Sequence, residues 1–237
     1  MAKKVFLGVG HGGVDSGATG NGFKEKDLNL SIAKACKEVL IRHGVEVKMS
    51  REKDEEDTLL QEVAECNLYA PDLAVDIHNN AGGGDGAEAF YHFGGGKGKT
   101  LAENIISEIV KLGQNSRGAK TRKNENGLDY YGFIRLTSAP AVIVECAFVD
   151  NATDIKIIDT EAERVKMGTA IAKGILSTLG IPYQEEVKKE EASTEETAQK
   201  PYYIVQVGAY SKKTDAESVI AKLKKSGFEG TVITCQP

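Results

Sequence analysis

The chain has 237 residues and a formal net charge of −5, with 41% hydrophobic and 27% charged residues. This length accommodates one sizeable α/β domain and a smaller appendage, because domains commonly span roughly 100 to 200 residues. The composition is typical of a soluble globular protein. No apolar run approaches the roughly 18 residues of a membrane span, and no segment is strongly basic. We therefore expect neither a membrane-spanning role nor a nucleic-acid partner.

The amino terminus leads directly into a short apolar run, with no signal-peptide core and no small-residue cleavage site. We therefore expect the protein to stay in the cytoplasm until the cell is lysed. The cysteines are far apart and form no CxxC motif, which favours reduced thiols over a disulfide framework or a cysteine zinc site. They are Cys36, Cys66, Cys146 and Cys235.

Strand-like and helix-like segments alternate along residues 1–182. Apolar runs predict strands at residues 4–9, 45–49, 73–77, 87–93 and 141–146. Helical spacing predicts helices at residues 28–42, 58–69, 99–112 and 161–179, the second opened by a capping box of Thr58 and Gln61 and the last followed by Gly180. This alternation predicts an α/β fold with a mostly parallel central sheet and helices on both faces.

The remaining residues differ in composition from this first domain. Residues 183–200 are rich in Glu, Lys, Ser and Thr, which is typical of a flexible linker. Residues 201–237 predict a small βαβ module with strands at 203–209 and 231–234, and a helix opened by a capping box of Thr214 and Glu217. A module this short rarely folds alone, so we expect it to pair with another copy or to pack on the first domain.

The first predicted strand ends in GVGHGG, which matches the GxGxxG pattern of dinucleotide sites. That fingerprint requires a helix that begins at its last glycine, whereas residues 14–23 form a glycine-rich loop and the helix begins only near Glu25. We therefore interpret the glycines as room for a side chain, His11, at the carboxyl end of the strand.

Three potential metal ligands converge on one edge of the predicted sheet. His11 and His78 each follow a buried strand, and Glu25 opens the helix that returns to this edge. Two histidines and a carboxylate match a catalytic zinc site, in which water takes the fourth position. Each residue also has a structural interpretation, as a hydrogen-bonded histidine or as an acid favoured at a helix N-terminus. Residue types and spacing leave both interpretations open.

The other charged candidates have similar alternatives. Glu145 interrupts the apolar run at residues 141–148, a costly place for a carboxylate unless it faces water at the metal and exchanges protons with it. A salt bridge to Arg135 is the alternative. His43 is expected to interact with a helix C-terminus and His92 to lie on a strand face, with a role as a spare ligand as the alternative for both.

At these motifs the sequence resembles the zinc-dependent N-acetylmuramoyl-L-alanine amidases of the Amidase_3 type, found in sporulation lysins and phage endolysins. The resemblance rests on GVGHGGVDSGATGNGFKEKDLNL, VDIHNNAGGGDGAEAFY and RLTSAPAVIVECAFVDN. It implies that His11, Glu25 and His78 ligate Zn²⁺ and that Glu145 is the catalytic carboxylate. The usual DPGHGG, SIHxN and ExGFxxN motifs read GVGHGG, DIHNN and ECAFVDN here. These departures remove no ligand and bear on substrate fit.

The implied reaction is hydrolysis of the amide between N-acetylmuramic acid and L-alanine in bacterial peptidoglycan. Asn80, Tyr130, Tyr131 and Arg135 are candidates for contacting the stem peptide, although loop packing also explains the last three. The alternatives are another zinc peptidase or deacetylase acting on the cell wall, and an inactive wall-binding protein.

The tail, YYIVQVGAYSKKTDAESVIAKLKKSGFEGTVI, resembles one half of a SPOR repeat, a module that binds cell-wall glycan. Because only one half is present, we expect that two chains each donate a βαβ unit, which makes the protein a homodimer through its C-terminal module.

Overall fold

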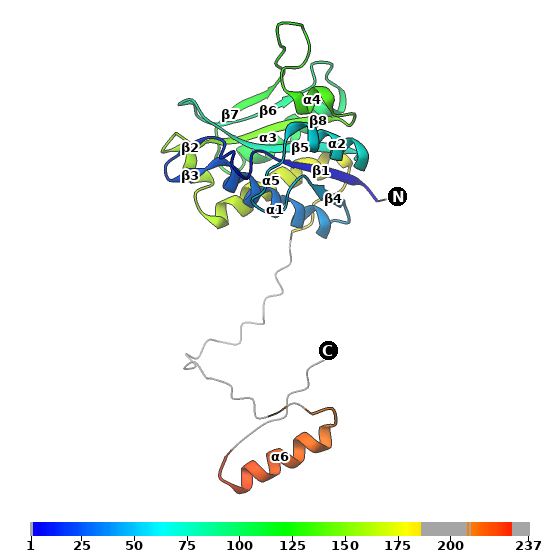
Figure 1. Ribbon diagram of the computed structural model, residues 1–237, viewed down its shortest axis with the longest axis vertical. Coiled ribbons are helices and arrows are strands. Elements are labelled where there is room, and N and C mark those ends of the chain that lie inside the picture. Colours follow the sequence, from blue (N-terminus) through cyan, green and yellow to red (C-terminus); the bar gives the residue numbers. More distant parts are fainter. Residues whose placement is uncertain (1, 186–207, 209, 229–237) are drawn as a thin grey trace. The chain divides into compact units, whose positions relative to one another are not determined.

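The computed structural model describes residues 2–185, 208 and 210–228. The chain divides into two compact units, Met1–Glu185 and Glu186–Pro237 (Figure 1). In the second unit the structure describes one helix, α6 (Lys213–Lys225). The tail helix is thus confirmed, but its predicted capping box is wrong, because the N-cap is Lys212, two residues before Thr214, and it makes no side-chain cap. The predicted strands of the tail, most of the predicted linker and Cys235 lie outside the described residues.

The first unit is built on a six-stranded sheet with the order β4-β1-β5-β8-β6-β7. Every neighbouring pair is parallel except β6 and β8, which are antiparallel. The strands are β1 (Lys4–Val9), β4 (Glu46–Met49), β5 (Leu73–Asn80), β6 (Ala87–Tyr91), β7 (Ser116–Lys120) and β8 (Ala141–Phe148). The expectation of a mostly parallel sheet is confirmed. A two-stranded hairpin of β2 (Thr19–Gly20) and β3 (Phe23–Lys24) lies within the predicted glycine-rich loop.

Helices cover both faces of this sheet, and α1 and α5 lie together on one side of it in Figure 1. The helices on the more extensive face are α1 (Glu25–Arg42), α3 (Gly96–Val110) and α5 (Glu161–Leu179), and those on the other face are α2 (Leu59–Tyr69) and the short α4 (Gly132–Leu136). A 3-10 turn, η1 (Asp154–Ile157), precedes α5. In the part of the chain that the structure describes, no helix combines the length and apolar character needed to cross a membrane.

The ends of these helices follow the predicted signals. Thr58 and Gln61 form the predicted capping box at the start of α2, and Gly180 ends α5 in the left-handed conformation. Two interior glycines of α5 allow its neighbours to approach closely. A Cβ at Gly168 would lie 2.5 Å from the carbonyl oxygen of Ile32 in α1, and one at Gly174 would lie 2.6 Å from the Cα of Ile105 in α3.

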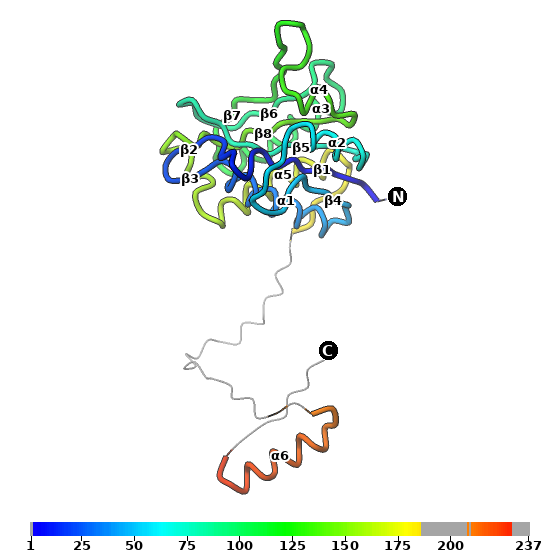
Figure 2. Tube along the Cα trace, in the orientation of Figure 1, coloured from blue at the N-terminus to red at the C-terminus, as the bar shows by residue number. Residues whose placement is uncertain are grey.

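Alternation along the strands separates an apolar core from a polar site. On β5, Val75 and Ile77 point into the larger core, whereas Ala74 points into the smaller core beneath α2 and α4. Since successive side chains alternate, Asp76 and His78 share the face of Ala74. The Cα trace in Figure 2 shows β5 next to β1, in blue, which carries Phe6 on the same face. This face is therefore apolar at the amino end of β5 and polar at its carboxyl end.

Candidate metal centre

His11, Glu25 and His78 come together at this polar end. One ligand atom from each lies within 4.8 Å of the others. The buried Glu25 carboxylate lies between the two imidazoles, with Oε2 3.2 Å from His11 Nε2 and Oε1 3.0 Å from His78 Nδ1. The backbone amides of Ala18 and Asn79 also donate to this carboxylate, so its position is fixed from several directions. The three residues grouped by the sequence are thus adjacent in the fold.

The glycines around His11 make this convergence possible. A Cβ at Gly10 would lie 2.1 Å from Cε1 of His78, and one at Gly17 would lie 2.5 Å from Cδ2 of His11 and 2.6 Å from Oε2 of Glu25. His11 itself has a φ of 63°, a left-handed conformation that is costly for a residue other than glycine. These contacts agree with the interpretation that the GVGHGG run makes room for a side chain instead of cradling a pyrophosphate.

Each histidine has a second carboxylate partner at its other ring nitrogen. His11 Nδ1 lies 2.8 Å from Asp15 Oδ2, and His78 Nε2 lies 3.1 Å from Asp76 Oδ2. Metal-binding histidines commonly donate their second N–H to a carboxylate, which fixes the orientation of the ring. Neither Asp15 nor Asp76 was predicted from the sequence. Asp76 could have been, because it interrupts an apolar strand just as Glu145 does.

The charges of the cluster stabilise one another. Hydrogen bonds from both histidines hold the pKa of Glu25 below its usual value, against burial, which acts to raise it. The Glu25 and Asp15 carboxylates raise the pKa of His11, also against burial. The pKa of His78 is well above its ordinary value because Asp76, Glu25 and Glu145 outweigh the cost of burying its charge. The carboxylates therefore favour positive charge between them.

Glu145 lies beside this cluster. It is the register partner of His78 on the neighbouring strand, and its Oε2 is buried with no hydrogen-bond partner among the described residues. Burial raises its pKa to about 7, with the nearby Glu25 and Asp76 acting in the same direction against His78. The predicted alternative of a salt bridge to Arg135 is wrong, since the Arg135 guanidinium donates to the backbone oxygens of Asp129 and Tyr130.

A second acid continues the register row of His78 and Glu145 across the sheet. Glu88 on β6 is the register partner of Glu145, and its carboxylate binds Arg117 and Lys120 of β7 and the Asn80 side-chain amide. The two cations hold the pKa of Glu88 below its usual value although burial opposes them. The two facing carboxylates thus differ in their partners. Arg117 and Lys120 balance the negative charge of Glu88, whereas Glu145 Oε2 has no hydrogen-bond partner among the described residues. The ion pairs of Glu88 with Arg117 and Lys120 could not be predicted from the sequence, because β7 has no apolar run that would identify it as a strand.

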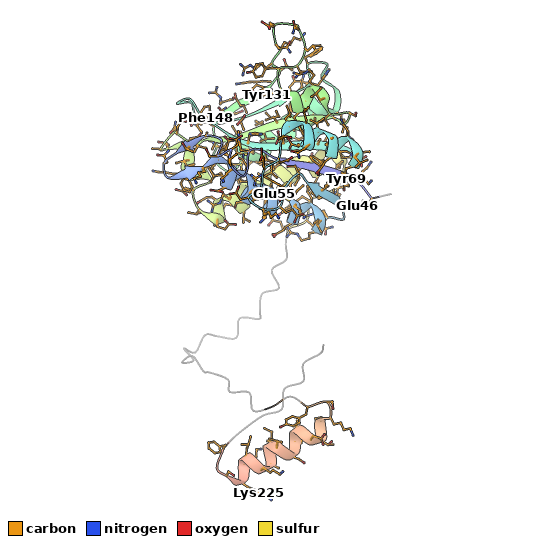
Figure 3. All side chains as sticks on the ribbon, viewed as in Figure 1. Glu46, Glu55, Tyr69, Tyr131, Phe148 and Lys225 are labelled. Atoms are coloured by element: carbon orange, nitrogen blue, oxygen red, sulfur yellow. The ribbon has the colours of Figure 1, made fainter. Side chains whose placement is uncertain are left out.

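The four candidates for substrate contact have different surroundings. Asn80 ends β5 at the polar edge, with its side chain bonded to Glu88. Tyr130 is 47% exposed and stacks under Arg122, with 3.8 Å between the guanidinium carbon and the ring centroid. Tyr131, labelled in Figure 3, packs against Phe90. Arg135 holds its own loop through the two backbone bonds described above, which agrees with its alternative as a loop-packing residue.

The remaining histidines lie outside the cluster. His43 follows α1, where its Nδ1 lies 2.7 Å from the Val39 oxygen, so it interacts with a helix C-terminus as expected. His92 follows β6 and pairs with Asp129. Cys36, Cys66 and Cys146 are buried free thiols, as expected.

A buried arginine secures the loop that carries His11. Arg51 is 2% exposed, and its guanidinium donates to the backbone oxygens of Val9, Gly10, Lys26 and Lys53. The role of Arg51 could not be predicted from the sequence, because a single arginine shortly after a strand forms no recognisable motif.

These residues suit a catalytic metal ion. Two imidazoles and one carboxylate form a typical three-ligand zinc set, and both imidazoles have the outer carboxylates that such ligands usually have. An acid with an elevated pKa lies next to them, as hydrolysis by an activated water requires.

Comparison with known proteins identifies the family. Residues 5–177 match the family model described as N-acetylmuramoyl-L-alanine amidase, and residues 178–234 match the SPOR domain. The N-acetylmuramoyl-L-alanine amidase CwlM of Bacillus licheniformis is 32% identical over 97% of this chain and 84% of its own length. The endolysin of Bacillus phage SPP1 is 34% identical over 76% of this chain and 68% of its own length.

Among solved structures, an N-acetylmuramoyl-L-alanine amidase from Clostridium difficile 630 aligns with a TM-score of 0.68. It shares 29% identity over 76% of this chain and 97% of its own. With a catalytic fold, a site and a family match that all agree, this chain belongs to the N-acetylmuramoyl-L-alanine amidases, which hydrolyse peptidoglycan.

Proposed function

We propose that this amidase is zinc-dependent, with His11, Glu25 and His78 as the metal ligands and Glu145 as the catalytic carboxylate. The observation that carries the proposal is the position of Glu145. It is the register partner of His78, and the three ligand atoms lie within 4.8 Å of one another. His78 and Glu145 thus lie side by side on the adjacent strands β5 and β8, while His11 follows β1 and Glu25 begins α1.

The bond cleaved is the amide between the lactyl group of N-acetylmuramic acid and L-alanine. Zinc held by His11, Glu25 and His78 would supply a Lewis acid for the lactyl carbonyl and would lower the pKa of water. Glu145 accepts the proton that the attacking water loses, and later gives it to the departing alanine amine. Its pKa of about 7 suits both steps, because the group must accept a proton and then release it near neutral pH.

Substitution of Glu145 tests this assignment. Glu145→Ala is expected to keep its bound zinc and to lose hydrolysis of purified peptidoglycan, since it removes the proton carrier and no ligand. Glu103→Ala, an exposed glutamate of α3 that pairs only with Lys99 among the described residues, is the matched control and should retain activity. Lysis by Glu145→Ala at the wild-type rate would refute the assigned role.

The chemistry of the products separates this proposal from other zinc hydrolases of the cell wall. An amidase releases new alanine amino groups without new reducing sugar ends, whereas an endopeptidase leaves the alanine blocked. A deacetylase releases acetate. An inactive wall-binding protein releases none of these, and the unpartnered Glu145 carboxylate argues against that alternative.

We further propose that residues 1–182 form the catalytic domain, residues 183–200 a linker and residues 201–237 a wall-binding module that dimerises. The match of residues 178–234 to the SPOR domain supports binding of this module to peptidoglycan. Dimerisation is supported by the small size of the module. Sedimentation of the full chain tests it, and a monomer that still binds purified wall would contradict it.

A further inference from the structure

Asp76 is a buried acid of β5 that no step described above uses. It is 3% exposed, and its Oδ2 lies 3.1 Å from Nε2 of His78, on the side of the ring away from Glu25. The other ring nitrogen, Nδ1, lies 3.0 Å from Glu25 Oε1. The His78 imidazole therefore spans two carboxylates, one at each nitrogen.

Only one of these two nitrogens can bind a metal while the other carries a proton. A neutral imidazole has one N–H and one lone pair, and an ionised carboxylate can only accept a hydrogen bond. We infer that Asp76 is a positioning residue that keeps the proton of His78 on Nε2 and thereby leaves Nδ1 for the metal. This inference rests on the zinc site proposed above.

The second oxygen of Asp76 faces another buried acid, Glu62 of α2. Asp76 Oδ1 and Glu62 Oε1 are both buried without a hydrogen-bond partner among the described residues. A Cβ at Gly8 would lie 2.7 Å from the former and 2.2 Å from the latter, so both oxygens crowd one backbone position. Glycine at position 8 is what gives the two carboxyl groups room above the strand.

Two carboxylates packed this closely away from water do not both ionise readily. Burial and the charges of Asp76 and Asp57 raise the pKa of Glu62 well above its usual value, with His78 and Arg51 acting the other way. Glu62 therefore holds its proton more readily than an exposed glutamate, and the contact that the inference uses is the 3.1 Å between Asp76 Oδ2 and His78 Nε2.

The two histidines of the site differ in how firmly they are held. The partner of His11, Asp15, has a side chain that is 64% exposed, so water competes for the same hydrogen bond. The side chain of Asp76 is only 5% exposed. Because a charge acts more strongly where water is excluded, the buried partner should contribute more to metal binding than the exposed one.

Asp76→Asn in the full chain tests the inference through zinc affinity, measured by competition with a chromophoric chelator. An amide can donate to Nε2 and so favour the opposite tautomer. We expect zinc to bind about 10- to 100-fold more weakly, the usual cost of losing such a partner. Asp15→Asn should lose less, and Glu65→Gln, on the same helix as Glu62, should leave the affinity unchanged.

A second measurement reads the tautomer directly. In the zinc-loaded wild-type chain, imidazole nitrogen NMR should show His78 bound through Nδ1 and protonated at Nε2, whether or not the variant folds. Zinc bound through Nε2, or wild-type zinc affinity in folded Asp76→Asn, would overturn the inference. A wild-type chain that binds no zinc at all would refute the zinc site itself, a result that the affinity of the variant cannot imitate.

Discussion

Substitution of Gly10 by alanine should separate folding from metal binding. The added Cβ would lie 2.1 Å from Cε1 and 2.3 Å from Nε2 of His78, whereas ordinary contact begins at 3.4 Å. The imidazole must therefore move by about 1.3 Å, while metal–ligand distances tolerate only about 0.2 Å. Overpacking of this kind costs roughly 1–3 kcal/mol, which a domain stable by about 5–15 kcal/mol survives.

Zinc affinity is the assay, with urea unfolding measured in parallel. Gly10→Ala should bind zinc at least about 100-fold more weakly, because a ligand and not merely its partner is displaced. Gly98→Ala is the matched control, since its Cβ would meet only ordinary contacts, 3.5 Å from the Ala141 oxygen and 3.8 Å from the Tyr91 Cβ. It should gain about 0.5–1 kcal/mol of helix stability and keep its zinc affinity. If Gly10→Ala bound zinc like the wild type, the reasoning from crowding would be refuted.

Four other predictions concern the site and its support. Activity should rise with pH towards about 7 and then level off, because only ionised Glu145 accepts a proton; a pH–rate profile that is flat from pH 5 to 8 would contradict this. The raised pKa of Glu145 also means that the metal-free fold loses stability as pH rises from 4.5 to about 7. At pH 8 the free energy of unfolding of Glu145→Gln, measured in urea, should therefore exceed that of the wild type by up to about 3 kcal/mol. Arg51→Ala should cost roughly 3–5 kcal/mol, because four backbone acceptors, three of them buried, each lose a donor, and a loss below about 1 kcal/mol in urea unfolding would argue against that role. Chelation should abolish activity and lower the melting temperature. Zinc added at 100 times its Kd should then raise the free energy of unfolding by about 2.7 kcal/mol. Full activity in excess chelator would exclude a metal role.

Much of the catalytic unit could be predicted because its strands are apolar runs and parallel strands share a carboxyl edge. The shared carboxyl edge of parallel strands predicts that His11 and His78 lie close together. The helix that begins at Glu25 adds the third candidate ligand. The direction of β6 could not be predicted, since alternation along a strand is the same in both directions. This reversal places Glu88, near the start of β6, opposite Glu145 near the end of β8.

Other elements lack a signal in the sequence. β7 reads SRGAK and α4 spans five residues, so neither contains enough apolar residues to show a period. Asp76 is different, because a charged residue inside an apolar strand is a visible signal. Like Glu145, Asp76 is a carboxylate that is costly to bury unless a partner compensates for it.

The close crossing of α5 and α1 at Gly168 bears on Glu25, at the start of α1. Glu25 is the first residue of α1, and the carbonyl of Ile32 that Gly168 accommodates lies seven residues further along, about 10 Å away along the axis. Because a helix shifts as a unit, we expect a methyl group at Gly168, which pushes on α1 near its middle, to displace the Glu25 carboxylate between the two imidazoles. Substitution of a residue that touches neither substrate nor metal is then expected to weaken hydrolysis.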